Sequence, residues 1–539
     1  MKKFRSVVNN CTHRFLAYWF IIFGFIFPLA GLFAQSPEIS RPEAIDFHVA
    51  QSIKKDNLYR HIQILASDSL EGREFGTFGI NRAADYIVSR LKKAGIKPMG
   101  DRGTYYQPVT VQGWSWEKLS LKMNDQELIP GIDFNAKIFD NQQAVKLSGT
   151  QFMFMGYGIK TDQYNDYQYA QGWDELMLIL DGEPIVDGKS LLTESEKLSI
   201  WSQDLKKKIE QAKMKNAKGI LLLRDSIYFP KKSGNIFDRI EYSMDSIERY
   251  ELPVISINIA ALPKIFKGQQ LETIHQYIAN VKEGKIASNY VPINYNIELQ
   301  SNFKPVFGRN IVAVIEGSDP ALKYKYIALS AHYDHLGIRN GQVYNGADDN
   351  ASGTAALIEV ATALQSLKNQ KGGLKRSVMI LFFTGEEKGL LGSKFFVKNP
   401  SIPLRMIRSN INIDMIGRAD EDHLDQASYV YVIGSDKINI LLDEAISEAN
   451  KYSVNYNLDY RYNDENHPSR LYYRSDHYNF ARLGIPSVFF FGGFHADYHQ
   501  PGDDIEKINL QKVQDISRLV YFTLINLANY DGTIRTNYK

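Results

Sequence analysis

Residues 56–97 carry apolar side chains at three- and four-residue spacing, which is the period of an amphipathic helix. The turn-forming stretch "DSLEGREFGTFG" divides this segment, so the pattern predicts two helices. The second helix should end at the sequence "GIKP", because glycine and proline commonly follow the last helical turn. The next stretch, "TYYQPVTVQ", predicts a strand.

The pattern changes over residues 113–290. Short apolar runs alternate here with polar loops, and one charged helix is predicted over residues 193–216. The segment is therefore predicted to be a separate β-rich module with one or two helices. The runs that predict its strands are "GTQFMFMGYGI", "ELMLILDGE", "GILLLRDS" and "LPVISINI".

From residue 294 onward, strand-like runs alternate with helical patterns. The runs "NIVAVIEG", "YKYIALSAHYDH", "SVMILFFTGEE", "RSNINIDMIG" and "IPSVFFFGG" predict strands, and residues 351–368, 439–451 and 510–530 predict helices. This order predicts an α/β fold with a mixed central sheet and helices on both faces. Ligands of such sheets bind beyond the carboxyl ends of the strands.

The N-terminus has the order of a secretory signal. Four basic residues precede the apolar run of residues 15–34, and a polar "QSPE" follows it. We expect cleavage after Ala34, although a run of about 20 apolar residues is also long enough for an uncleaved anchor. Cleavage would remove Cys11, the single cysteine, and would change the formal charge from +2 to −2. The mature chain would then have no thiol for catalysis or disulfides, no stable membrane span and no basic block suited to nucleic acid.

Potential metal ligands follow several of the predicted strands. Taken singly, an acidic pair is usually a solvated loop or a helix cap, and a lone histidine is usually a satisfied polar residue. Together they bring carboxylates and imidazoles to one sheet edge, and three acidic and two histidine ligands without cysteine suit two zinc ions that share a carboxylate. These candidates are His332, Asp334, Asp348, Asp349, Glu386, Glu387, Asp414 and His499.

The motifs "HYDH", "GADDNASG", "GEEKGLLGS", "NIDMIG" and "DYHQPGDD" resemble, in order and spacing, those of the two-zinc aminopeptidase family. This family also contains glutamate carboxypeptidase and the transferrin receptor ectodomain. The segment "EGREFGTFGINRAADYI" is similar to the family's N-terminal helical region, and "MGYGI" through "AKGILLLRD" resembles its inserted protease-associated domain. After the predicted signal at residues 1–34, the resemblance implies a catalytic domain in residues 35–112 and 291–539 and an insert at 113–290.

The resemblance also implies the metal ligands. Asp348 would bridge two zinc ions per chain. His332 and Asp414 would complete one ion, and Glu387 and His499 would complete the other.

Further residues would assist the reaction. Glu386 would be the general base, and Asp334 would orient His332. The peptide bond between Asp348 and Asp349 is the candidate for the family's cis bond. Tyr472 would help to hold the oxyanion, with the adjacent Tyr473 as a competitor.

The adjacent pair Glu386 and Glu387 raises the question of how neighbours could have different roles. Side chains alternate along an extended backbone, so we expect one carboxylate to face a metal ion and the other to face the bound water. In this interpretation the pair ends a strand.

The expected function is that of a secreted zinc exopeptidase, an aminopeptidase acting on peptides, located in the periplasm, at the cell surface or outside the cell. A carboxypeptidase or amidohydrolase of the same fold is the alternative, and an arginine pair formed by Arg474 and Arg418 would favour it. A binding ectodomain without activity is a third possibility. His335, His477 and His495 are expected to line the pocket or lie behind the ligands. The sequence predicts neither the oligomeric state nor the preferred side chain.

Overall fold

The computed structural model describes residues 38–137, 144–168, 174–225, 240–244, 252–424, 426 and 428–538. The expected signal segment, with Cys11, lies outside these residues. Among the helices of the described part, none is both long enough and apolar enough to cross a bilayer.

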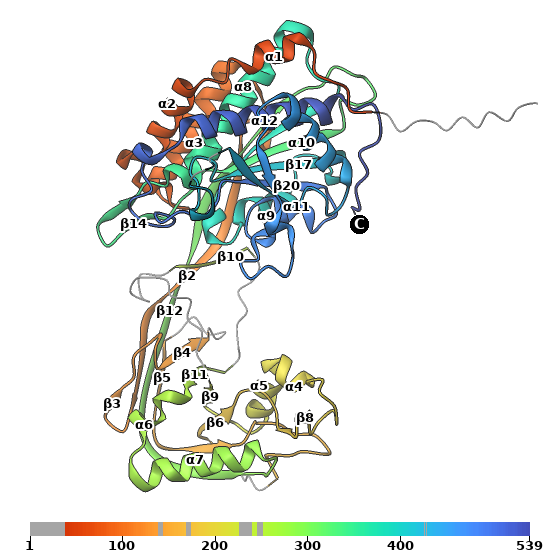
Figure 1. The fold of residues 1–539 in the computed structure, drawn as a ribbon. Coiled ribbons are helices and arrows are strands. Elements are labelled where there is room, and N and C mark those ends of the chain that lie inside the picture. Colours follow the sequence, from red (N-terminus) through yellow and green to blue (C-terminus); the bar gives the residue numbers. More distant parts are fainter. Residues whose placement is uncertain are drawn as a thin grey trace, which may run out of the picture. The chain divides into compact units, whose positions relative to one another are not determined.

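One part of the chain is built on a mixed sheet with the strand order β19-β18-β20-β17-β13-β16-β12 (Figure 1). The central strands β16, β13, β17 and β20 are parallel, whereas β18 and β12 are antiparallel to their neighbours β20 and β16. The predicted mixed sheet is therefore confirmed. The bounds are β12 (Ser288–Ile315), β13 (Tyr326–His332), β16 (Ser377–Phe383), β17 (Ile407–Asp414), β18 (Tyr429–Ile433), β19 (Asn457–Asp459) and β20 (Ser487–Phe491).

Helices cover both faces of this sheet, because its central strands are buried on both sides. Ile327 and Leu329 of β13 pack in one core with α1 (Ala44–Ala50), α2 (Lys55–Leu65), α3 (Phe78–Ala94), α8 (Gly353–Lys371), α10 (Ile440–Tyr452) and α12 (Leu510–Asn529). Ala328 of the same strand packs on the opposite face with α9 (Leu391–Lys398) and α11 (His477–Ala481). The alternation along β13 thus separates two hydrophobic cores.

The long strands β2 (Tyr106–Met123) and β12 pair antiparallel along most of their length. The predicted boundaries at residues 113 and 290 therefore fall within continuous strands. Between them, β5 (Val145–Met155), β6 (Leu176–Leu180), β9 (Gly219–Arg224) and β11 (Val254–Asn258) form a parallel run, with β4 (Phe134–Lys137) antiparallel at its edge. The similarity of this segment to a protease-associated domain stays a prediction.

The helices of the segment differ from the prediction. The single helix expected over residues 193–216 is two helices, α4 (Ile200–Gln203) and α5 (Leu205–Met214), because Asp204 is extended and its side chain caps α5 by accepting from the Lys206 N–H. The helix α5 packs on one face of the β5–β11 run, and α7 (Gly268–Lys282) packs on the other.

The remaining short elements complete the topology. They are α6 (Leu262–Ile265), β1 (Lys97–Pro98), β3 (Gln126–Glu127), β7 (Ile185–Val186), β8 (Lys189–Ser190), β10 (Glu241–Ser243), β14 (Gly337–Arg339) and β15 (Gln342–Tyr344).

Two of the buried central strands end directly on candidate site residues, β13 at His332 and β17 at Asp414. The carboxyl edge of the sheet is therefore where the site lies.

Candidate active site

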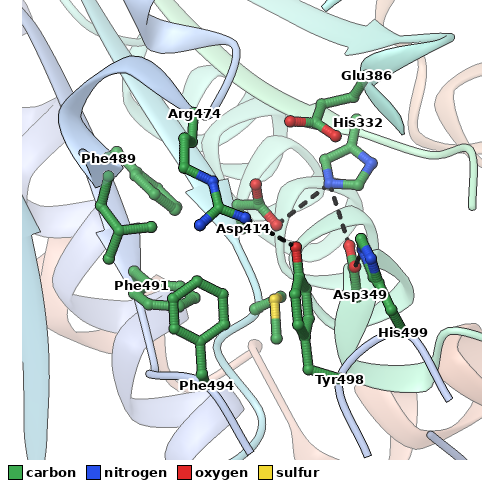
Figure 2. A pocket seen from close by; sticks show the side chains of 12 residues that line it. His332, Asp349, Glu386, Asp414, Arg474, Phe489, Phe491, Phe494, Tyr498 and His499 are labelled. Atoms are coloured by element: carbon green, nitrogen blue, oxygen red, sulfur yellow. Dashed lines mark hydrogen bonds and ion pairs between the residues drawn. The ribbon is translucent and has the colours of Figure 1, made fainter. Parts of the chain in front are cut away.

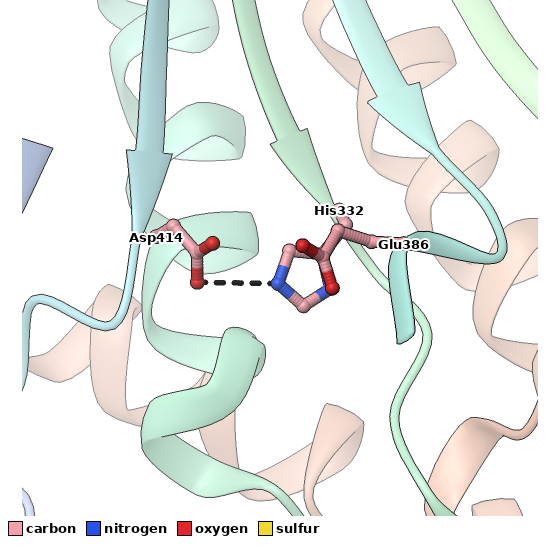
Figure 3. Close-up of side chains that lie close together, drawn as sticks. All are labelled: His332, Glu386 and Asp414. Atoms are coloured by element: carbon pink, nitrogen blue, oxygen red, sulfur yellow. Dashed lines mark hydrogen bonds and ion pairs between the residues drawn. The ribbon is translucent and has the colours of Figure 1, made fainter. Parts of the chain in front are cut away.

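His332, Glu386 and Asp414 form one group at this edge (Figure 3). Nε2 of His332 lies 3.1 Å from Oδ1 of Asp414. Burial alone would lower the pKa of His332, but the carboxylates of Asp414 and Glu386 raise it well above its usual value. Oδ2 of Asp414 accepts a hydrogen bond of 2.7 Å from Ser475, whose hydroxyl is held in turn by Asn412. The first group therefore joins the ends of β13 and β17 with the turn after β16.

A second group adjoins the first and contains His335, Asp349, Glu387 and His499. Oε1 of Glu387 lies 3.0 Å from Nδ1 of His335 and 3.2 Å from Nε2 of His499. Oδ2 of Asp349 lies 3.1 Å from the same His499 atom, whereas Oδ1 of Asp349 lies 3.4 Å from Nε2 of His332 in the first group (Figure 2). The carboxylate of Asp349 therefore lies between the two groups.

The structure corrects the prediction for Asp348. Its Oδ1 accepts a hydrogen bond of 2.5 Å from the Gly417 N–H, and its Oδ2 lies 3.4 Å from Nε2 of His495. The backbone N–H groups of Asp348 and Asp349 both donate to Asp503. These bonds hold the Asp348 carboxylate away from the cluster, so the predicted shared ligand is off by one residue.

The cis peptide bond lies between Asp349 and Asn350, and not between Asp348 and Asp349 as expected. It falls in the irregular turn η5 (Ala347–Ser352), which leads into α8.

Glu386 and Glu387 do separate, but not by strand alternation. The strand β16 ends at Phe383, and the pair lies in a short 3₁₀ turn, η6 (Glu386–Lys388), after Gly385 with a φ of 68°. The two carboxylate oxygens of Asp334 accept hydrogen bonds from the backbone N–H groups of this turn, Oδ1 at 3.0 Å from Glu386 and Oδ2 at 3.3 Å from Glu387. The tight turn therefore directs one side chain into each group.

Asp334 was expected to orient His332 through its carboxylate. The atom nearest Nδ1 of His332 is instead the backbone oxygen of Asp334, at 3.2 Å, with the carboxylate at 3.7 Å. The Asp334 carboxylate thus holds the Glu386–Glu387 turn, and its main chain faces the histidine.

Burial and mutual repulsion shape the electrostatics. Burial raises the pKa of Glu386 well above its usual value, helped by the nearby charges of Asp414 and Glu387. Burial would also raise the pKa of Glu387, but His499 and His335 lower it well below the usual range. Burial, with the charge of Glu387, raises the pKa of Asp349 to about 8. The two adjacent glutamates are therefore electrostatically distinct.

The cluster has the donors that a cation requires. Nδ1 and Nε2 of His335, Nε2 of His499 and Oε1 of Glu387 are buried and make no aligned hydrogen bond within the described residues, although Oε1 of Glu387 lies within 3.2 Å of both histidines. One ligand atom from each residue lies within 4.8 Å of the others in two sets of three, which are His332, Glu386 and Asp414, and His335, Asp349 and Glu387. Buried polar atoms are normally hydrogen-bonded. A donor set of imidazoles and carboxylates that face one another, without sulfur, fits divalent first-row metal ions.

A pocket opens beside both groups (Figure 2). One side is polar and the other is apolar, and Arg474 reaches over the apolar side, 5.3 Å from the ring centre of Phe494. The lining residues are His332, Asp349, Glu386, Asp414, Met415, Leu471, Arg474, Phe489, Phe491, Phe494, Tyr498 and His499.

Tyr498 is the tyrosine of the pocket. Its hydroxyl accepts a hydrogen bond of 3.4 Å from Arg474, and its ring stacks on His499 at 3.8 Å between centres. The prediction of Tyr472 is not supported, because that ring is buried beside Gly434 and His477 and is not part of the lining. Its competitor Tyr473 donates to Glu465 and does not line the pocket either. The position of Tyr498 next to His499 in "DYHQ" was the signal available in the sequence.

The other candidates have mixed outcomes. Arg418 lies 3.1 Å from Asp497 and does not line the pocket, so no arginine pair forms there. His335 belongs to the second group, which corrects its expected role as lining. His477 packs against Phe489, and His495 lies behind the site beside Asp348.

Comparison with known proteins supports the sequence resemblance. Residues 310–524 match the description "Peptidase family M28". A probable leucine aminopeptidase of Trichophyton verrucosum is 29% identical over 215 residues, which are 39% of this chain and 56% of the relative. Aminopeptidase YwaD of Bacillus subtilis is 30% identical over 202 residues, which are 36% of this chain and 39% of the relative. The chain thus spans 56% of the length of the first of these relatives and 39% of the second.

The solved structure of an aminopeptidase from Aneurinibacillus sp. strain AM-1 has the same fold. The two structures superpose with a TM-score of 0.54 at 18% sequence identity, and the aligned region covers 92% of this chain and 98% of the aminopeptidase chain. The matched family segment includes both groups of candidate ligands, from His332 to His499. Over residues 310–524, the chain is thus similar to peptidase family M28.

Proposed function

We propose that this protein is a zinc aminopeptidase that removes N-terminal residues from peptides. The observation that carries the proposal is the position of Asp349, whose two oxygens face different histidines, His332 and His499. A carboxylate in this position can be shared by two adjacent cations. The similarity to this family and the aminopeptidase names of several relatives support the reaction class.

The residues divide into two ligand sets. His332 and Asp414 would hold one zinc ion, and Glu387 and His499 would hold the other, with Asp349 shared and His335 beside the second ion. Zinc accepts imidazole and carboxylate ligands and, when bound, would acidify a water molecule and polarise the scissile carbonyl group.

Glu386 is the proposed general base. It belongs to the first group, where burial raises its pKa well above the usual value of a glutamate, and a carboxylate beside the bound water can act as a general base. Asp334 fixes the turn that directs it. Glu386 would take the proton from the attacking water and deliver it to the leaving amine.

The pocket suits an apolar residue at the amino terminus of a peptide. The proposed metal ligands and Glu386 line one side, and Phe489, Phe491 and Phe494 on the other side suit an apolar side chain. The apolar residues are Met415, Leu471, Phe489, Phe491 and Phe494. The hydroxyl of Tyr498 would donate to the substrate carbonyl oxygen, positioned by Arg474.

The leader pattern at residues 1–34 supports export of the enzyme, by the order of its basic, apolar and polar residues. We propose that the protein acts on peptides outside the cytoplasm. Cell fractionation tests this, and recovery of the protein from the cytoplasm alone would contradict it, whereas N-terminal sequencing of the exported protein tests cleavage after Ala34.

The direct test of the activity is a panel of chromogenic aminoacyl anilides with free or acetylated amines, assayed before and after treatment with a chelator. We expect cleavage of free-amine substrates with apolar side chains, loss of activity on chelation and recovery with zinc. Preference for blocked substrates or for a C-terminal acidic residue would favour the amidohydrolase or the carboxypeptidase. No cleavage of any substrate by the zinc-loaded protein would favour a binding ectodomain.

A further inference from the structure

Arg73 is a buried arginine in the N-terminal part of the chain, far in sequence from the ligand motifs. It ends the turn η1 (Asp68–Arg73), and only 1% of its surface is exposed. Glu71, Gly72 and Arg73 all have positive φ values. A Cβ atom at Gly72 would lie 2.5 Å from the Tyr344 oxygen, so this turn packs directly against the loop that leads to Asp349.

The guanidinium group of Arg73 binds main-chain oxygens of two different loops. It donates hydrogen bonds of 2.9 Å to the oxygen of Tyr333, 2.7 Å to that of Asn345 and 2.9 Å to that of Gly346. A further hydrogen bond goes to the oxygen of Leu65, at the end of α2. The fixed fork of an arginine side chain can hold several acceptors at a defined spacing.

These acceptors adjoin the candidate ligands. Tyr333 stands directly after His332, and Gly346 begins the turn that carries Asp349. The backbone oxygen of Arg73 also accepts a hydrogen bond of 3.2 Å from the His335 N–H. Arg73 thus ties the His332–His335 loop to the loop before Asp349.

The charge of Arg73 adds to this effect. Burial lowers its pKa to about 10, opposed by the nearby carboxylates of Asp349, Asp334 and Glu387, so the group stays protonated at neutral pH. Its hydrogen bonds in the described part of the chain go to carbonyl oxygens, and no ion pair with a carboxylate occurs there. A positive charge therefore lies near these carboxylates, while their oxygens remain available to bind a cation.

We propose that Arg73 is a positioning residue for the metal site, which fixes the spacing between the His332 loop and the Asp349 loop and makes zinc affinity depend on the N-terminal segment. The inference rests on the proposed zinc site. Residues that support ligands from behind typically change metal affinity by about 10- to 100-fold when they are altered.

The chain offers a matched control in Arg376. This arginine is also buried, with 2% exposure, and donates to main-chain oxygens of Leu527, Tyr530 and Gly532. It stands just before β16 begins at Ser377, whereas the cluster lies beyond the other end of that strand. Loss of Arg376 removes the same kind of contact away from the site.

The experiment uses the full-length protein and the variants Arg73→Gln, Arg73→Lys and Arg376→Gln. Zinc dissociation constants are measured by competition with a chromophoric chelator, and thermal unfolding is followed with and without zinc. We expect Arg73→Gln to weaken zinc binding about 10- to 100-fold and to reduce the rise in melting temperature that zinc produces. Arg376→Gln should lower the melting temperature of the metal-free protein and leave the zinc dissociation constant unchanged.

Arg73→Lys keeps the positive charge but lacks the planar guanidinium group that binds several acceptors, so it should also weaken zinc binding. This variant replaces Arg73→Gln in the experiment if the glutamine variant does not fold. Wild-type zinc affinity in the Arg73 variants, or an equal loss in Arg376→Gln, would overturn the inference and leave the proposed function intact. A wild-type protein that binds no zinc would overturn both.

Discussion

Oδ2 of Asp349 lies 3.1 Å from Nε2 of His499, while Oδ1 of the same carboxylate lies 3.4 Å from Nε2 of His332. One side chain therefore contacts both ligand groups. If it is shared by two cations, its removal should affect both of them, whereas removal of a ligand such as Asp414 or Glu387 should affect one.

The first prediction compares Asp349→Asn with Asp348→Asn. Asparagine is a weak, neutral ligand, so Asp349→Asn should lower the metal content of both sites and abolish most activity. Asp348→Asn keeps an oxygen that can accept from the Gly417 N–H and should retain its metal. Metal analysis by mass spectrometry after dialysis measures both, and the reverse result would restore Asp348 as the shared ligand.

The second prediction separates Glu386 from Glu387. Glu386→Gln removes the proton acceptor but keeps the shape, so activity should fall about 10²- to 10⁴-fold while metal content stays near normal. Glu387→Gln replaces a ligand that faces His335 and His499, so metal should be lost first and activity with it. Parallel kinetic and metal assays distinguish the two. Near-normal rates and metal content in both variants would make the pair an ordinary loop.

The third prediction concerns pH. In the metal-free protein, burial opposes the charged form of His499, but Glu387 and Asp349 raise its pKa to about 10. The ring nitrogen must lose this proton to bind zinc, so the apparent affinity should rise with pH, by about tenfold per unit for each proton released. Calorimetry in two buffers of different ionisation enthalpy counts the protons. Zinc binding to His499→Gln should release fewer protons than binding to the wild type. A zinc affinity of the wild type that does not change between about pH 6 and 8 would contradict this prediction.

The fourth prediction tests the tyrosine of the pocket. Tyr498→Phe removes one hydroxyl donor beside Arg474, so kcat should fall by about 10²- to 10³-fold if that donor stabilises the transition state. Metal content should stay unchanged. Tyr472→Phe is the control, because that ring is buried away from the pocket lining and its variant should keep wild-type kcat. The opposite pattern would return the role to Tyr472.

The central sheet could be predicted because its strands are apolar runs of strand length, each bounded by turn signals. The strands that end at His332 and Asp414 are almost entirely buried, so they appear in the sequence as short runs of strand length, although the predicted runs extend a few residues past the observed ends. Parallel neighbours then bring their ends to one edge, which is why most of the site residues could be named in advance.

The choice between Asp348 and Asp349 depends on long-range contacts. Both are acidic and adjacent, and their orientation is set by hydrogen bonds with Gly417 and Asp503, which lie far along the chain. A sequence pattern carries no information about which of the two faces the cluster.

The role of Tyr498 has a similar cause. Tyr498 and Tyr472 both stand near motif residues in the sequence, so the sequence does not distinguish them. Tertiary packing brings Tyr498 against Arg474 and buries Tyr472 beside Gly434. Likewise, the main-chain bond from His335 to Arg73 helps to fix the loop that places His335 in the second group.

The most direct test of the account is a crystal structure of the zinc-loaded protein with anomalous data collected at the zinc edge. We expect two anomalous peaks, one on each side of the Asp349 carboxylate, the first beside His332 and Asp414 and the second beside Glu387 and His499. A single peak, or peaks that contact Asp348 instead of Asp349, would contradict it.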